Sequence, residues 1–388
     1  MRNSLLYASP LPPQRSGISH YSEVLLQGLR EHFDITLLVD GDDIDPRHYP
    51  GMEVLRYRDA AEWDRFDFKL YNVGNNPWYH CYIYEAALRH PGTVILHDAV
   101  LYYLYTGYHQ TRELFFQEVF EQEGPLGVAL FKEMSKTGLD FLQFRQPELL
   151  PLNRELIDSG NAFLVHSSYT LNKIKKRAKG PIRSRQVNMV VRPPDVPTER
   201  AGIRNRFGIP PRATLVASFG FIAPTKLNHV VCEAIQRVDA LHPGRIFYLM
   251  VGEGDYVDQY LGASIRKTGF VTEEEFDQYL ACADLVVNLR YPSMGETSAA
   301  LLRALSFARP CVVCNDGWFS ELRGDVAVKL DPVPEESLRE MLYEVMLAYL
   351  EHPKLFEVLG RRAQEWVKAE CCVTKISAQI AQFLRESA

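Results

Sequence analysis

The chain has 388 residues, 46% of them hydrophobic and 24% charged, and a formal net charge of −6. This composition is typical of a globular protein, and the length suits two domains rather than one core. The negative charge argues against binding to a nucleic-acid backbone, while a local basic pocket for one diphosphate stays compatible with it. No apolar run is long enough to span a membrane, and the start "MRNSLLYASPLPPQ" is too brief for a signal peptide, so we expect a cytoplasmic protein.

Short apolar runs recur along the chain, each followed by a turn and a helical pattern. The first series lies at 5–10, 35–40, 69–74, 93–98, 162–167 and 188–194. The second lies at 214–220, 246–254, 285–290, around 311 and at 327–332. Runs that are apolar on both faces and alternate with helices are typical of parallel sheets covered on both sides. The sequence therefore predicts an α/β protein made of two successive doubly wound, Rossmann-like units.

Three other segments divide the chain. Residues 99 to about 160 are aromatic-rich and helical in pattern, which indicates an insertion without strands. The proline-rich stretch 191–213 reads as an interdomain linker. Apolar residues at helical spacing near the end predict a terminal helix that crosses back onto the first lobe. We expect a first domain at 1–192, joined by 372–388, and a second domain at 193–371.

Two motifs suggest metal chemistry only weakly. Cys311 and Cys314 form a CxxC, but four strand-type residues there would point the two thiols to opposite faces. The D-x-D spacing in "VDGDDID" near residue 40 has many polar neighbours, which favours a solvated loop over a carboxylate metal site. We therefore expect no metal and no cofactor.

The loops after the strands carry the candidate site, because doubly wound folds bind ligands past the carboxyl ends of their strands. In "NLRYPSMGETSAALLRAL" a strand ends, a loop holds the single acid Glu296, and a helix begins with Thr297 and Ser298 as possible caps. The helix start offers N–H groups and a positive dipole end to a phosphate or a sugar hydroxyl. Glu296 is then either an acceptor for ligand hydroxyls or only a capping carboxylate.

In the second unit, "SFGFIAPTK" places Gly220 and Lys226 at a strand-to-helix turn. The lysine either neutralises a diphosphate leaving group or is a solvated surface residue. Gly269, Phe270 and Val271 end a strand in "KTGFVTEEEF", where exposed backbone could pair with a base edge.

In the first unit, Gly17 lies in the loop after the first strand, where the absence of a β-carbon lets the chain approach a ligand. His97 follows the fourth strand, either as a packed core histidine or as a group that faces the ligand.

These loops resemble those of bacterial retaining glycosyltransferases of family four, which have the GT-B fold. The resemblance covers essentially the whole chain and rests on the order and spacing of "PLPPQRSGISHYS", "VILHDAVLYYL", "FLVHSSYT", "FGFIAPTK", "GFVTEEEFDQYLACADLVVNLR" and "PSMGETSAALLRAL". It implies two lobes facing a central cleft, an acceptor-side lobe at 1–192 and a nucleotide-sugar-binding lobe at 193–371, with the last helix crossing back at 372–388. It also implies metal-independent transfer of a sugar from a nucleoside diphosphate sugar, of UDP or GDP type, to an acceptor hydroxyl.

The resemblance assigns roles to individual residues. Glu296 matches the first acid of the family's Glu-x7-Glu motif, which contacts the donor sugar, and Thr297 and Ser298 match the backbone that meets sugar and phosphates. Lys226 matches the diphosphate lysine, His97 the histidine near the sugar, and Gly17 the glycine loop at the diphosphate.

The sequence departs from the family at two places. The position of the second acid, which usually holds the ribose, is Ala304, with Arg303 beside it, and Phe221 stands where an arginine is common. We expect Arg290, from a neighbouring loop, to supply the second positive charge.

Other functions remain open from sequence. A sugar-nucleotide epimerase would need further acids, and a glycoside hydrolase would need two carboxylates flanking one bond. The missing acid also allows a non-catalytic sugar-nucleotide-binding partner subunit. The acceptor is expected to be a glycan or a lipid-linked intermediate of polysaccharide biosynthesis, and peripheral membrane contact through the aromatic insertion would fit such a pathway.

Overall fold

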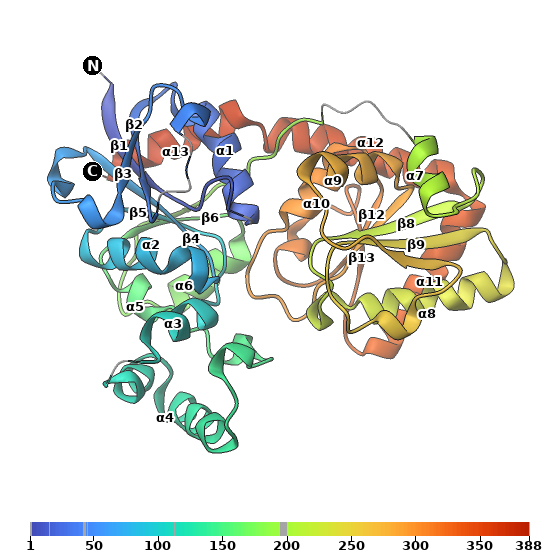
Figure 1. The fold of residues 1–388 in the computed structure, drawn as a ribbon, viewed down its shortest axis with the longest axis horizontal. Helices are drawn as coiled ribbons and strands as arrows, with labels where there is room; N and C mark the ends of the chain where they lie inside the picture. Colours follow the sequence, from blue (N-terminus) through green and yellow to red (C-terminus); the bar gives the residue numbers. More distant parts are fainter. Residues whose placement is uncertain are drawn as a thin grey trace. The chain divides into compact units, whose positions relative to one another are not determined.

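The computed structural model describes residues 2–14, 16–41, 44, 46–111, 113–194 and 200–387, which form two compact units (Figure 1). Unit 1 comprises Met1–Val190, Met294–Thr297 and Val373–Ala388, and unit 2 comprises Val191–Ser293 and Ser298–Cys372. Asp42, Asp43 and Asp45 of the D-x-D stretch lie outside the described residues, as does 195–199 of the expected linker.

Unit 1 is built on a seven-stranded parallel sheet of order β3-β2-β1-β4-β5-β6-β7. Its strands are β1 (Asn3–Ala8), β2 (Phe33–Val39), β3 (Glu53–Arg56), β4 (Phe68–Val73), β5 (Thr93–Leu96), β6 (Ala162–Val165) and β7 (Ser184–Gln186). Its helices are α1 (Gly17–Leu29), α2 (Pro77–Arg89), α3 (Tyr102–His109), α4 (Phe115–Thr137), α5 (Arg154–Ile157), α6 (Ser168–Arg177) and α13 (Val373–Ser387). Every residue of β5 and β6 is buried, as expected of central strands covered on both faces.

The terminal helix α13 is an integral part of unit 1. It lies beside α1 (Figure 1), and the two helices approach so closely at Gly28 that a β-carbon there would come within 2.6 Å of Ser377 Oγ. The apolar face of α13, with Ile376, Ile380 and Phe383, is buried as its helical spacing predicted.

Unit 2 is built on a six-stranded parallel sheet of order β10-β9-β8-β11-β12-β13. Its strands are β8 (Thr214–Phe219), β9 (Ile246–Val251), β10 (Ile265–Lys267), β11 (Leu285–Asn288), β12 (Cys311–Cys314) and β13 (Val328–Leu330). Its helices are α7 (Arg200–Arg206), α8 (Asn228–Leu241), α9 (Glu273–Cys282), α10 (Ala299–Ser306), α11 (Glu335–Glu351) and α12 (Pro353–Glu370). The prediction of two doubly wound α/β units is confirmed.

Several local predictions were wrong. No strand covers 188–194; the edge strand β7 ends at Gln186, and Met189, Val190 and Val191 are buried without pairing in a sheet. The prolines at 193 and 194 cannot donate to a ladder, which fits this irregular path. The expected linker contains a helix, α7, and β10 ends at Lys267 rather than at 269–271.

The described residues of the insertion after β5, 99–111 and 113–160, form α3, α4, α5 and short 3₁₀ turns but no strand, as predicted. Its aromatic residues divide between core and surface. Tyr102, Phe115 and Phe131 are fully or almost fully buried, whereas Phe116 and Phe120 on α4 are exposed. Among the described residues, no helix is both long enough and apolar enough to cross a membrane.

Candidate functional site

The register of the unit 1 sheet brings two histidines together at its carboxyl edge. Leu96, the last residue of β5, pairs with Val165, the last residue of β6. The next residue in each chain segment is a histidine, so His97 and His166 occupy neighbouring positions, with ring centroids 5.1 Å apart. Tyr21 of α1 completes the group, because its ring packs edge-on against both histidines, at 4.9 and 5.4 Å.

His97 is held in one orientation by Asn72. The amide nitrogen of Asn72 donates to Ala8 O, which turns its Oδ1 toward His97 Nε2 at 3.2 Å. His97 Nε2 therefore carries the proton and Nδ1 carries the lone pair. Burial, with smaller effects from His166 and His80, holds the pKa of His97 well below its usual range, so the ring is neutral. Within the described residues, Nδ1 has no hydrogen-bond partner.

His166 is arranged in the opposite sense. Its Nδ1 donates to the carbonyl of Val187 at 3.0 Å, which leaves the lone pair on Nε2. Burial lowers the pKa of His166 to about 4. Neither Nε2 of His166 nor the hydroxyl of Tyr21 meets a partner in the part of the chain that the structure describes. Sequence reasoning missed both residues, although the strand-then-histidine pattern of "VILHD" recurs in "FLVHS" and could have found His166.

The loop that carries Glu296 lies at the same edge of unit 1. Met294 O accepts hydrogen bonds from Ala99 N (2.9 Å) and Val100 N (3.0 Å), just past β5. Gly295 O accepts from Thr170 Oγ1 of α6 at 2.6 Å. Gly295 has φ +88° and a β-carbon there would lie 2.4 Å from Ala99 Cβ, so only glycine fits.

Glu296 and Thr297 are both 8% exposed. Glu296 Oε2 accepts from Met294 N at 2.8 Å and thereby closes its own loop. The cap of α10 is instead Ser298, whose Oγ accepts from Leu301 N at 3.1 Å. Of the two expected caps, Ser298 has that role and Thr297 does not, and the reading of Glu296 as the helix cap is wrong. No described residue bonds to Thr297 Oγ1.

In unit 2 the candidate site is the turn after β8. Gly220 has φ +89°, and the Lys226 ammonium lies so close that a β-carbon on residue 220 would be 2.7 Å from Nζ. Lys226 Nζ donates to Phe219 O at 3.1 Å, which keeps the ammonium at the end of the strand. The turn thus holds a positive charge at the carboxyl edge of the unit 2 sheet, where doubly wound folds bind ligands.

Arg290 lies on the adjacent loop, two residues beyond β11. Its backbone N–H donates to Cys314 Sγ at 3.3 Å, and Tyr291 N donates to Thr225 O at 2.8 Å, which joins this loop to the turn of Lys226. Phe221, one of the two departures from the family that the sequence resembles, is 72% exposed.

The position of the missing second acid is filled by structural residues. Ala304 is completely buried. Arg303 does not substitute for it, because its guanidinium forms ion pairs with Glu273 and Asp277 of α9. The side chain at position 304 therefore offers no acceptor to a ribose.

The remaining candidates lie at the edges of these groups. Gly269 lies two residues past the end of β10 and has φ +78°. Phe270 follows it and is 52% exposed. Val271 follows before the capping box of Thr272 and Glu275 that begins α9. Gly17 is the first residue of α1, and a β-carbon there would meet no atom within 4 Å.

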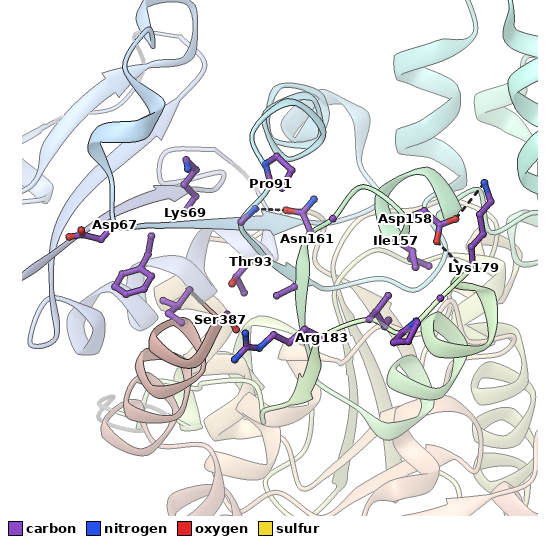
Figure 2. Close-up of a pocket in the computed structure, with 18 residues that line it drawn as sticks. Asp67, Lys69, Pro91, Thr93, Ile157, Asp158, Asn161, Lys179, Arg183 and Ser387 are labelled. Atoms are coloured by element: carbon purple, nitrogen blue, oxygen red, sulfur yellow. Dashed lines mark hydrogen bonds and ion pairs between the residues drawn. The ribbon is translucent and has the colours of Figure 1, made fainter.

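The CxxC and a cavity in unit 1 do not contribute to this arrangement. Cys311 and Cys314 are buried in β12, and burial raises the pKa of the Cys314 thiol to about 12. Among the described residues, no group of three or more His, Cys, Asp or Glu is placed to hold a metal. A cavity of about 760 Å³ in unit 1 is lined by Phe68, Thr93 and Ala162, the first residues of β4, β5 and β6, and so lies at the edge of the sheet opposite His97 and His166 (Figure 2).

The fold matches solved structures over the whole chain. Anabaena Alr3699/HepE in complex with UDP has 16% identity and a TM-score of 0.67, with all of both chains covered. Sucrose-phosphate synthase from Thermosynechococcus elongatus has 15% identity and a TM-score of 0.69, with 99% of each chain covered. WaaG, described as a glycosyltransferase involved in lipopolysaccharide biosynthesis, has 12% identity and a TM-score of 0.62, with 98% of this chain and 99% of WaaG covered.

At these identities the likeness concerns the fold, and this chain has the GT-B architecture of two Rossmann-like units. The sequence matches no protein-family model, and comparison with curated proteins gave no match.

Proposed function

We propose that this protein is a glycosyltransferase that moves a sugar from a nucleoside diphosphate sugar to an acceptor hydroxyl. The observation that carries the proposal is the Gly220 turn of unit 2, which holds the Lys226 ammonium at the strand end. A fixed positive charge at that place suits a diphosphate whose negative charge grows as it leaves. The similar fold of HepE, solved with UDP and with UDP-glucose, supports this choice of ligand.

In this mechanism the bond between the anomeric carbon and the β-phosphate oxygen breaks, and the acceptor oxygen forms a new bond to that carbon. The acceptor proton passes to the departing diphosphate, so the products are a glycoside and a nucleoside diphosphate. Lys226, Arg290 and the start of α10 at Ser298 stabilise the diphosphate, and Gly269–Val271 pair with the base. Glu296, Thr297 and His97 orient the sugar, and Gly17 lets the backbone approach the phosphates. No side-chain nucleophile takes part, and the configuration is retained.

The finer assignment extends the resemblance to family four. The donor is of UDP or GDP type, the acceptor is a glycan or a lipid-linked intermediate of polysaccharide biosynthesis, and no metal is required. The enzyme acts in the cytoplasm, with peripheral contact at the inner face of the membrane where the acceptor is lipid-linked. The exposed aromatic residues Phe116 and Phe120 of α4 favour that contact.

The test is a thermal-shift screen of UDP, GDP, ADP, dTDP and their common sugar conjugates, with Lys226→Ala as the comparison. A nucleotide that binds only the folded state raises the midpoint by mass action, and the proposal predicts that one nucleotide does so and that Lys226→Ala abolishes the shift. Transfer is then followed with EDTA present, and the anomeric coupling of the product reports its configuration. If no nucleotide raises the midpoint, the proposal fails.

A non-catalytic partner subunit is the second candidate, and the buried Ala304 in place of the second acid favours it. Such a protein would bind the nucleotide sugar without consuming it in the presence of any acceptor. Donor turnover separates the two functions.

A further inference from the structure

Three buried side chains of unit 1 present polar atoms that the described residues leave unsatisfied, and they touch one another. His97, His166 and Tyr21 are 5, 3 and 4% exposed. Their ring centroids lie 4.9 to 5.4 Å apart. The unsatisfied atoms are His97 Nδ1, His166 Nε2 and Tyr21 Oη. Buried polar groups are nearly always hydrogen-bonded, so three exceptions in one cluster require further partners, which a ligand or ordered water supplies.

The chemistry of these atoms restricts that ligand. The partners Asn72 and Val187 fix a proton on the opposite nitrogen of each histidine, so the cluster offers two acceptors, and Tyr21 offers one donor. Two neighbouring hydroxyl groups complement this set, because each can donate to one histidine while one of them accepts from Tyr21. The rings carry no charge, so nothing within the cluster offsets the cost of burying an ion.

We propose that Tyr21, His97 and His166 form a subsite for two neighbouring hydroxyl groups of a neutral sugar, in which His166 and Tyr21 are recognition residues. The inference rests on the proposed function for the identity of the sugar, which is either the one transferred or part of the acceptor. The position at the carboxyl ends of β5 and β6 agrees with ligand binding in doubly wound sheets.

Three substitutions isolate the unsatisfied atoms. His166→Asn places an amide nitrogen where Nδ1 was, so the bond to Val187 O is kept while the acceptor at Nε2 is removed. His166→Gln places an amide oxygen near the position of Nε2 and restores the acceptor. Tyr21→Phe removes only the hydroxyl. The matched control is His109→Asn, because His109 is also buried in unit 1 but is hydrogen-bonded to Glu155 at 2.9 Å.

Binding of UDP and of UDP-glucose is measured by calorimetry for each variant, followed by the KM for a panel of neutral sugar acceptors at saturating donor. Loss of one hydrogen bond predicts that His166→Asn and Tyr21→Phe each weaken UDP-glucose about five- to tenfold and leave UDP unchanged. His166→Gln recovers part of the loss, and His109→Asn changes neither affinity. If the donor affinities stay unchanged and the acceptor KM rises instead, the subsite belongs to the acceptor. Unchanged donor affinities and acceptor KM in both variants overturn the proposal and leave a water-filled cluster.

A further measurement distinguishes failure of the proposed function from failure of the sugar subsite. If the unmodified protein binds none of the nucleotides and sugar conjugates of the thermal-shift screen, glucose alone is tested by ligand-observed NMR. Glucose binding that His166→Asn abolishes supports the subsite without the transferase, and absence of glucose binding overturns both.

Discussion

The Lys226 ammonium occupies the space that a side chain on residue 220 would need, because a β-carbon there would lie 2.7 Å from Nζ. Gly220→Ala must therefore displace the ammonium, and its φ of +89° adds backbone strain. We expect this change to weaken UDP binding about tenfold or more, close to the effect of Lys226→Ala, since a hydrogen bond to a charged group contributes about 1.5–3 kcal/mol. Calorimetry with UDP measures both. If the Gly220→Ala protein binds UDP as the wild type does, a side chain at residue 220 does not displace the Lys226 ammonium from its binding position.

Gly17→Ala gives the contrasting glycine substitution, because its β-carbon meets open space at the first turn of α1. The melting temperature should not fall. If Gly17→Ala lowers the affinity for a UDP-sugar, the ligand approaches the backbone at residue 17. If the variant and the wild type have equal affinity, Gly17 is not part of the binding site.

Arg290 and Arg303 lie on either side of Glu296 in the sequence and should behave differently. Arg290 is on the loop joined to the lysine turn, so Arg290→Ala should weaken UDP binding about tenfold, like Lys226→Ala. The guanidinium of Arg303 forms ion pairs with Glu273 and Asp277, so Arg303→Ala should lower thermal stability and leave UDP affinity unchanged. The same titration on both variants checks this. Unchanged UDP affinity in Arg290→Ala contradicts the role of Arg290.

The strands that form the two sheets were largely predictable because buried parallel strands are apolar on both faces. The edge strand β3 was not, since its residues are half-buried or exposed and leave no apolar run. The apolar run 188–194 predicted a strand that does not form, because Met189 and Val190 are buried in an irregular segment. Burial and strand pairing are separate properties, and hydrophobicity reports only the first.

The candidate site was partly predictable. Gly220, Lys226, Glu296 and His97 follow strands, so chain order alone predicted that they lie past the carboxyl ends of the strands, where doubly wound folds bind ligands. His166 also follows a strand, but its unsatisfied nitrogen depends on Val187 O and could not be read from the sequence. Gly252, which follows β9 in "VGEGDY", has a packing role that the sequence does not reveal. A β-carbon at Gly252 would lie 2.1 Å from Gly220 O, so this glycine lets the β9 loop pack against the lysine turn.

The buried histidines predict a pH dependence of stability. Burial lowers the pKa of both His80 and His166 to about 4, below the unfolded value of about 6.5. Between these pH values the unfolded chain binds protons that the folded chain does not, so the free energy of unfolding decreases as the pH falls from about 6.5 to about 4. Each histidine contributes up to about 1.4 kcal/mol per pH unit. Urea unfolding of the wild type and His166→Asn from pH 7 to 4.5 should give a shallower slope for the variant. Parallel slopes would mean that His166 binds protons equally in the folded and the unfolded state.

Gly28→Ala tests how tightly the terminal helix is bound. Its β-carbon would lie 2.6 Å from Ser377 Oγ and 2.8 Å from Val373 Cγ1, so α1 and α13 must separate. Overpacking of this kind costs about 1–3 kcal/mol, which urea unfolding measures as a lower midpoint. Adding Ser377→Gly should recover part of the loss, because it removes Ser377 Oγ and Cβ, which the new methyl group meets, and leaves Val373 Cγ1 close. A single variant with the wild-type midpoint would show that α13 is loosely held.

Glu296→Gln separates the closure of the loop by this carboxylate from its proposed role in orienting the donor sugar. The glutamine carbonyl can still accept from Met294 N, so the loop and the melting temperature should be preserved. The charge is lost, and if Glu296 orients the donor sugar, turnover should fall about 100-fold, as for other groups that stabilise a transition state. UDP affinity should not change, because the diphosphate is assigned to Lys226 and Arg290. Turnover with UDP-glucose and the best acceptor, beside UDP calorimetry, gives both values. Full turnover in the glutamine variant would mean that Glu296 serves only to close its loop, and catalysis would then have to be assigned to His97 and the unit 2 turn.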